Sequence, residues 1–169
     1  MLIQVEPILL EQKSVFVQLM NLYNYGFTEY ENVDINEYGY YNYTNTDALW
    51  NDENWHAFFI RANGALAGFA LVHNHCRFVS GENARNIDEF FVMKKYRRMG
   101  VGKFAANAVF DMFRGKWEVL QLPNNFPAQK FWKSVISEYT GNNYQECGST
   151  NAEWVGFIFD NSASGGTKA

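Results

Sequence analysis

A cluster of cations and glycines in the second half of the chain has the composition of an anion-binding loop. The segment KKYRRMGVGK, residues 94–103, holds five cations and two glycines, although the whole chain has a formal net charge of −4. Gly100 and Gly102 would let the backbone approach phosphate oxygens without a Cβ in the way, and arginine binds phosphate bidentately. A helix starting at these glycines would add free N–H groups and a positive dipole end. We therefore predict a phosphate-binding helix start here.

A second segment, in the first half of the chain, is acidic and rich in tyrosine. No lysine or arginine occurs from Ser14 to Ile60, whereas seven acidic residues do, and seven of the ten tyrosines lie between Tyr23 and Tyr43. Carboxylates and tyrosine rings both attract ammonium groups. The segment is either a solvated acidic loop or the wall of a pocket for a cationic ligand.

The hydrophobic pattern predicts the elements that must position these residues. Strands are predicted at 2–10, 55–62, 66–72, 86–93, 117–122, 143–147 and 153–159, and helices at 12–25, 100–113 and 125–137. Residues 28–46 are predicted to be loop with a short helix. Gly26 is the predicted end of the first helix, and Asn63-Gly64 predicts a two-residue hairpin turn. The strands at 86–93 and 117–122, joined by a helix, should be parallel, within a mixed sheet.

The glycine loop does not fit two common phosphate-binding motifs. A P-loop needs a longer glycine-rich run ending in Lys-Ser or Lys-Thr, and the dinucleotide fingerprint needs a third glycine where Ala105 stands. RRMGVG, residues 97–102, instead resembles the Q/R-x-x-G-x-G/A acetyl-CoA signature of the GNAT acetyltransferases. Residues 125–131, with Asn125, Ala128 and Phe131, resemble the family's NxxAxxF element on the next helix. The resemblance covers residues 87–132 by motif and most of the chain by element order.

This resemblance implies a fold, a cosubstrate and a set of binding residues. The expected fold class is α/β (α+β), a GNAT-like mixed and partly splayed sheet of about six to seven strands flanked by about four helices. The implied cosubstrate is acetyl-CoA, whose phosphates would lie at the helix start, with the rest in a slot between the splayed strands. The implied binding residues are Phe91, Val92, Met93, Arg97, Arg98, Met99, Gly100, Val101, Gly102, Lys103, Asn125, Ala128 and Phe131.

Acetyl transfer to an amine needs a proton acceptor and hydrogen-bond donors for the carbonyl oxygen. The resemblance favours Glu89 as the catalytic base, with Asp88 as the second candidate, because many members carry an acidic residue at this point. Strand alternation would turn only one of them into the slot, and pairing with Arg85 is the structural alternative. The backbone N–H near Val92 or Met93 is the expected donor.

The departing thiolate also needs a proton. Trp132 stands where the family often has the tyrosine that supplies it, and an indole N–H does not ionise near neutral pH. A substitute is expected: Tyr96, Tyr139, a tyrosine of the Tyr23–Tyr43 segment, or water.

Composition, net charge and cysteine count support the remaining expectations. We expect one domain over 1–160 and a flexible tail over 161–169, no transmembrane helix and no signal peptide. Two cysteines indicate reduced thiols and a cytoplasmic protein, the net charge disfavours nucleic acid, and no metal site is predicted. The leading hypothesis is an acetyl-CoA-dependent N-acetyltransferase acting on a small-molecule amine, and the family's habit suggests a homodimer. A protein or peptide acetyltransferase and a non-catalytic CoA-binding sensor are the alternatives.

Overall fold

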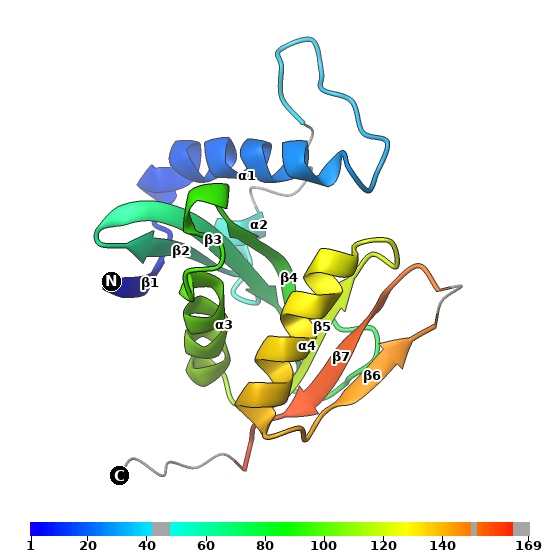
Figure 1. Cartoon of the computed structure of the whole chain (residues 1–169). Coiled ribbons are helices and arrows are strands. Elements are labelled where there is room, and N and C mark those ends of the chain that lie inside the picture. The colour runs from blue at the N-terminus through cyan, green and yellow to red at the C-terminus, as the bar shows by residue number, and fades with distance from the viewer. Residues whose placement is uncertain (42–47, 150–151, 164–169) are drawn as a thin grey trace.

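The computed structural model describes residues 1–41, 48–149 and 152–163, and one seven-stranded sheet forms its centre (Figure 1). The strands are β1 (Ile3–Pro7), β2 (His56–Ala62), β3 (Ala65–His73), β4 (Arg85–Val92), β5 (Lys116–Gln121), β6 (Gln145–Gly148) and β7 (Val155–Asp160). The α-helices are α1 (Lys13–Phe27), α2 (Ala48–Asn51), α3 (Val101–Met112) and α4 (Phe126–Thr140). The mixed α/β class and the numbers of strands and helices are as predicted.

The sheet runs in the order β1-β2-β3-β4-β5-β7-β6, and β4 and β5 are its parallel pair. The β2–β3 hairpin turns at Asn63 and Gly64, whose φ angles are 50° and 80°. Positive φ at both central residues defines the turn type that Asn-Gly favours, so this prediction is confirmed. The predicted β4–α3–β5 crossover is also confirmed, and its parallel strands are the point where the sheet opens.

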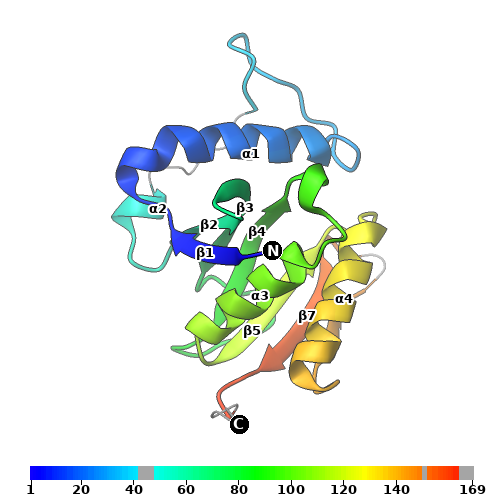
Figure 2. The same cartoon turned by 60° about the vertical axis from the view of Figure 1, so that its left-hand side comes forward.

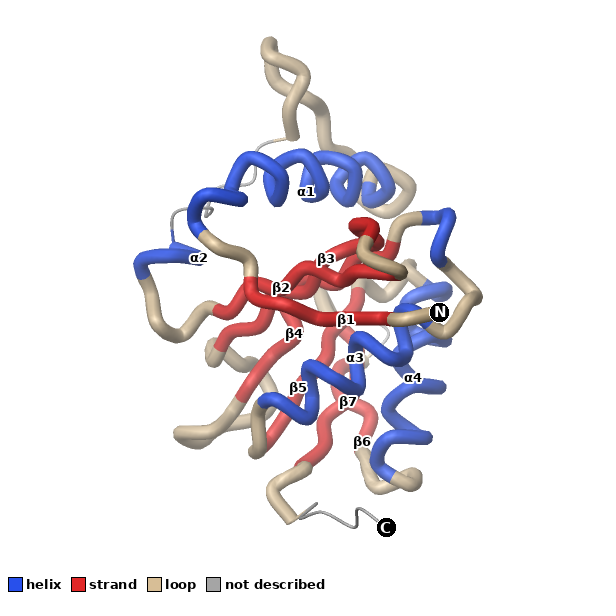
Figure 3. The backbone as a smooth tube through the Cα atoms, turned by 90° about the vertical axis from the view of Figure 1, so that its left-hand side faces the viewer, coloured by secondary structure: helices blue, strands red, loops and turns tan. Residues whose placement is uncertain are grey.

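Two layers of helix cover the two faces of the sheet (Figures 2 and 3). On one face, Phe16 and Met20 of α1 pack with Phe59, Phe69 and Leu71 from β2 and β3. The other face carries α3 and α4, whose buried side chains form a larger cluster with β5 and β7. Alternation along the strands divides their side chains between these layers. The strand residues that point towards α1 therefore belong to a different environment from those that point towards α3.

Several predicted boundaries differ from the structure. The first strand ends at Pro7, after which a 3₁₀ turn (Leu10–Gln12) leads into α1. Helix α1 continues through Gly26 to Phe27, because Phe27 packs one turn along from Tyr23, with ring centroids 4.7 Å apart. Residues 28–41 contain no helix; the short helix is α2, and positions 42–47 lie outside the described residues.

The folded part of the chain extends beyond the predicted domain end at residue 160. Asn161 is 1% exposed, its Oδ1 accepts a hydrogen bond from the N–H of Gly115 at 2.8 Å, and its Nδ2 donates to Phe110 O at 2.8 Å. These bonds fix the end of β7 to the α3–β5 connection. Positions 164–169 of the predicted tail lie outside the described residues. Within the described ranges, no helix is long and apolar enough to cross a membrane.

Candidate active site

The start of α3 presents free space where the sequence predicts phosphate binding. Gly100 is the N-cap, in the left-handed conformation with φ of 82°, and no side chain caps the helix. A Cβ placed on Gly100 would meet no heavy atom within 4 Å. The first turn of α3 therefore has N–H groups that no side chain caps, next to open space at Gly100, and this geometry suits an anion.

The cations around this helix start differ in what they contact. Arg97 donates from Nε to the carbonyl oxygen of Val92 at 2.8 Å, which fixes the loop to the end of β4. Lys103 forms an ion pair with Glu138 of α4. Arg98 is exposed, with a φ of 61° that turns the chain immediately before the helix. Of the three predicted phosphate-binding cations, Arg97 and Lys103 thus also have structural contacts.

The NxxAxxF element lies directly against the glycine loop. A Cβ on Gly102 would come within 3.2 Å of two ring carbons of Phe131 and 3.5 Å of Val92 Cγ2. Phe131 also stacks on Phe90 of β4, with ring centroids 5.9 Å apart. Asn125 caps α4, because its Oδ1 accepts the Ala128 N–H at 3.2 Å. The two sequence motifs are therefore brought together, and the glycine at 102 permits this close approach of α3 and α4.

The sheet opens between β4 and β5, as the splayed-strand prediction requires. The two strands pair only where Arg85–Ile87 faces Trp117–Val119, and β4 continues to Val92 without a partner in β5. Gln121, at the end of β5, is 4% exposed; its Nε2 donates to Val119 O, whereas its Oε1 has no partner among the described residues. An unpaired strand edge and an orphaned buried carbonyl fit a ligand that carries amide groups, as the pantetheine arm of CoA does.

One of the two expected backbone donors is already occupied. The N–H of Met93 donates to Ala67 O of β3 at 2.8 Å. Because backbone groups alternate in direction along a strand, the N–H of Val92 points away from β3 and towards the gap. Val92 is thus the candidate donor for a carbonyl oxygen, and Met93 is not.

Glu89 lies at the α1 side of this gap and has an unusual environment. Its Oε2 accepts a hydrogen bond from the hydroxyl of Tyr23 on α1. The pKa of the Glu89 carboxyl is raised to about 8, first by burial and also by the nearby charges of Asp88 and Glu31, while the Tyr23 hydrogen bond acts in the opposite direction. A carboxyl group with this pKa can exchange a proton near neutral pH, as a catalytic base must.

Asp88 faces the same side of the sheet as Glu89, contrary to the alternation expected from the sequence. The β3–β4 register pairs Leu71 with Glu89 but Val72 with Ile87, so Asp88 is the extra residue of a β-bulge. Its Oδ1 accepts from His73 Nε2 at 3.1 Å, while His73 Nδ1 accepts the His75 N–H at 2.9 Å. Asp88 is therefore held by His73, and Glu89 is the carboxyl that faces Tyr23.

Part of the tyrosine-rich segment joins the end of α1 to the second half of the sheet. Tyr30 follows α1, its ring centroid is 6.0 Å from that of Phe27, and its carbonyl oxygen accepts a hydrogen bond from Asn124 Nδ2 at 3.0 Å. Asn124 lies in the β5–α4 connection, so this bond holds the segment against that connection. We call residues 28–31 the strap. Tyr38 and Tyr40 are exposed in the loop beyond it, and Tyr43 lies outside the described residues.

The structure separates three tyrosines that could replace the absent proton donor at position 132: Tyr139, Tyr96 and Tyr23. Trp132 itself is 5% exposed and packs edge-on to Phe90 in the core. Tyr139 donates to Asp111 Oδ1 at 2.9 Å on the outer side of α4, and Tyr96 is buried beneath α3. Tyr23 contacts Glu89. The sequence placed Tyr23 only within a general tyrosine-rich segment, and its contact with a residue 66 positions away was not predicted.

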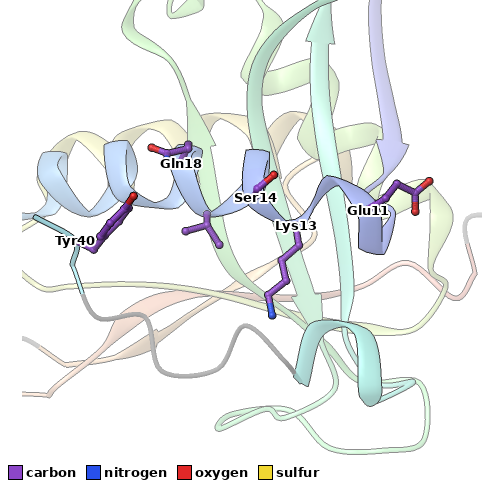
Figure 4. A pocket seen from close by; sticks show the side chains of 6 residues that line it. Glu11, Lys13, Ser14, Gln18 and Tyr40 are labelled. Atoms are coloured by element: carbon purple, nitrogen blue, oxygen red, sulfur yellow. The ribbon is translucent and has the colours of Figure 1, made fainter. Parts of the chain in front are cut away.

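Other candidate features lie away from the gap. A shallow, open hollow beside the start of α1 is lined by Glu11, Lys13, Ser14, Val17, Gln18 and Tyr40, of which only Tyr40 belongs to the tyrosine-rich segment of the sequence (Figure 4). Burial raises the pKa of the Cys76 thiol to about 12 and that of Cys147 to about 11. Both thiols are thus protonated at neutral pH, which is unsuitable for a nucleophile.

Solved structures of other proteins share this fold. An aminoglycoside acetyltransferase from an uncultured soil metagenomic sample, crystallised with trehalose, is 20% identical, with a TM-score of 0.59 over 79% of this chain and 86% of its own. A ribosomal-protein alanine N-acetyltransferase from Escherichia coli is 11% identical, with a TM-score of 0.60 over 99% of both chains. The PaiA N-acetyltransferase from Thermoplasma acidophilum, solved with coenzyme A, is 10% identical, with a TM-score of 0.63 over 95% of this chain and 99% of its own.

No curated protein sequence matches the chain. The sequence model of the acetyltransferase (GNAT) family does match, over residues 17–135, which include the gap-lining part of β4, the helix start and the NxxAxxF element. The chain therefore belongs to the acetyltransferase (GNAT) family.

Proposed function

We propose that this protein transfers an acetyl group from acetyl-CoA to a primary amine of a small molecule, by direct attack of the amine while both substrates are bound. The observation that carries the proposal is the position of Glu89, half-buried at the open end of a gap that begins beside an uncapped helix start. Family membership supports acetyl transfer and CoA binding.

The residues fit distinct tasks in this reaction. The first turn of α3 and Arg98 would hold the diphosphate of the cosubstrate, which supplies an acyl group activated as a thioester. Val92 N–H would donate to the carbonyl oxygen. Glu89 would remove the proton that an alkylammonium must lose, and a carboxyl group of pKa about 8 is better matched to that proton than an ordinary glutamate. The protonated state of both cysteines supports direct attack over a cysteine-bound acyl group.

The acceptor is inferred from the closed side of the gap. The hydrogen bond from Asn124 to Tyr30 holds the strap against the β5–α4 connection, where the strap would narrow the space open to an extended peptide. Glu31 lies on the strap and Asp88 beside the base, so the entrance is acidic, with Tyr23, Phe27 and Tyr30 as aromatic surfaces. Both features favour a compact cationic amine. The aminoglycoside acetyltransferase among the structural neighbours acts on amines of this kind.

Release of free CoA thiol, measured with acetyl-CoA and a panel of acceptors, tests the proposal. The panel contains diamines, aminoglycosides, a peptide with a free amino terminus, and the hydroxyl analogue of each small amine. We expect turnover with cationic small amines and none with the hydroxyl analogues, because Glu89 is positioned to accept an ammonium proton.

The two alternatives give different results in the same assay. Turnover with the peptide alone would assign the protein to peptide acetylation and contradict the closed acceptor site. Acetyl-CoA binding by calorimetry, with no thiol release for any acceptor, would support a non-catalytic CoA sensor instead.

A further inference from the structure

The departing thiolate needs a proton donor, and the geometry of the reaction restricts where that donor can be. The attacking nitrogen and the leaving sulfur are bonded to the same carbon atom while the acyl group is transferred. A group that takes the nitrogen's proton and a group that gives a proton to sulfur must therefore both lie within reach of this carbon. With Glu89 as the proton acceptor of the proposed function, a hydroxyl group held against Glu89 would be within that reach.

Tyr23 is the tyrosine that meets this requirement among the described residues. Its hydroxyl donates to Glu89 Oε2, and its ring is fixed by edge contacts with Phe69 and Phe91, at centroid distances of 5.7 Å and 5.8 Å. These rings belong to β3 and β4, so Tyr23 is held against the strand that carries the base. The hydroxyl thus has a defined position at the gap.

The other hydroxyl groups considered are elsewhere. Tyr139 is committed to Asp111 and accepts from Asn161 on the far side of α4. Tyr96 is 9% exposed within the cluster formed by Ile60, Val101 and Ala105. Tyr25 and Tyr38 are exposed to solvent, at 68% and 75%.

We propose that Tyr23 is a catalytic residue that donates the proton to the leaving thiolate, and that Glu89 then restores the proton to Tyr23. This inference rests on the proposed function. Glu89 first passes the proton of the alkylammonium to solvent; the neutral amine nitrogen then forms the C–N bond and releases its second proton to Glu89 Oε1. The C–S bond breaks with its electron pair on sulfur, which takes the Tyr23 hydroxyl proton. The phenolate then takes the proton from Glu89, so the products are the amide and the free thiol.

The charges around the pair are consistent with this relay. Asp88 and Glu31 both face Glu89, and Asp88 is in turn paired with His73. Their negative charges favour the protonated form of the Glu89 carboxyl. Glu89 must be in this form when it returns a proton to Tyr23.

Substitution Tyr23→Phe tests the proposal, because it keeps the ring and removes only the hydroxyl. We expect kcat to fall by about a hundredfold, with calorimetric affinity for acetyl-CoA within about twofold of the wild type. Tyr96→Phe is the matched control and should leave both quantities unchanged. An unchanged kcat for Tyr23→Phe would overturn the proposal.

A binding measurement separates proton donation from a structural role. Thiolate absorbance is titrated with pH for CoA bound to each protein, with desulfo-CoA as the blank. If Tyr23 donates to sulfur, the bound thiol becomes at least about tenfold less acidic in Tyr23→Phe, because a hydrogen bond to a charged atom is lost. If Tyr23 only positions Glu89, its loss leaves Glu89 more protonated, and the bound thiol is equally or more acidic; that result overturns the proposal. Failure of the wild type to bind CoA at all would instead refute the proposed function.

Discussion

At the scale of single residues, the central feature is a carboxyl group whose proton affinity is set by its surroundings. Glu89 has few solvent contacts, two negative neighbours in Asp88 and Glu31, and one hydrogen-bond donor in Tyr23. Burial and like charge outweigh the donor, so the pKa rises to about 8. Glu89 is thus mostly protonated at pH 7 and mostly ionised above pH 8.

Substitution of Glu89 by glutamine tests this assignment. Glutamine has the same shape but cannot accept a proton, so kcat should fall by at least about a hundredfold, while acetyl-CoA affinity stays within about twofold. Steady-state kinetics and calorimetry measure the two effects. Glu82→Gln, at an exposed position away from the strap, is the control. Turnover that survives Glu89→Gln unchanged would remove Glu89 as the base.

The same group predicts a pH dependence of stability. The carboxyl has a pKa of about 8 in the folded protein, against an ordinary value of 4.5, so between these pH values the folded state holds a proton that the unfolded state has released. Stability from Glu89 is therefore complete below pH 4.5 and declines as pH rises through 8. Urea unfolding of wild type and Glu89→Gln at pH 5 and pH 9 should show a relative gain for the variant at pH 9. A constant difference between the two proteins would contradict the raised pKa.

At the scale of elements, α3 and α4 show which parts of the site follow from the sequence. The glycines at 100 and 102 and the asparagine at 125 act on the chain next to them, so helix starts and motifs were predictable. Contacts set by the packing of distant elements were not predictable from the sequence. The bulge at Asp88 shifts alternation by one residue, and the meeting of Tyr23 with Glu89 depends on how α1 lies across β4. Gly26 has a low helix propensity and was predicted to end the helix, yet it lies inside α1, where Tyr23 and Phe27 pack against each other.

The start of α3 yields a charge-specific prediction. Asparagine and aspartate both tolerate a left-handed φ and both cap helices, so Gly100→Asn and Gly100→Asp should fold alike. Only aspartate places a negative charge where the diphosphate is expected. Calorimetry with acetyl-CoA should therefore show a larger loss for Gly100→Asp, by about tenfold relative to Gly100→Asn. Equal affinities for the two variants would place the phosphates elsewhere.

The strap yields a prediction about the acceptor. Asn124→Ala removes the hydrogen bond that fastens Tyr30 to the β5–α4 connection. We expect the KM for the amine to rise several-fold, by about the 1 kcal/mol that one such bond contributes, and the affinity for acetyl-CoA to be unaffected. Asn143→Ala, at another exposed position, is the control. A changed acetyl-CoA affinity with an unchanged amine KM would show that the strap does not form the acceptor site.

At the scale of the whole molecule, the sheet consists of two parts that meet at β4 and β5. Three register pairs join them, against five to seven for most of the other neighbouring strands. The remaining connection comes from α3 and α4, including the Lys103–Glu138 ion pair. A ligand in the gap would contact both parts.

Ligand binding should therefore raise the stability of the whole molecule. At a CoA concentration of about one hundred times Kd, the stabilisation expected by mass action is about 2.7 kcal/mol. Thermal unfolding followed by circular dichroism measures it as an increase in Tm with CoA concentration. Gly100→Asp should need correspondingly more CoA for the same increase, whereas a Tm independent of CoA would contradict binding to the folded state.

Because β4 and β5 pair over only a short stretch, the chain could be cut there into two fragments. Every strand before it comes from residues 3–92 and every strand after it from residues 116–160, so a cut at the exposed Arg114 would sever no strand and no helix. Asn161 connects the two sides of such a cut, because its Nδ2 donates to the carbonyl oxygens of Phe110 and Phe113 at 2.8 Å and 3.2 Å. Fragments 1–114 and 115–169, produced separately, should reassemble through these contacts, and CoA should promote their association by bridging them.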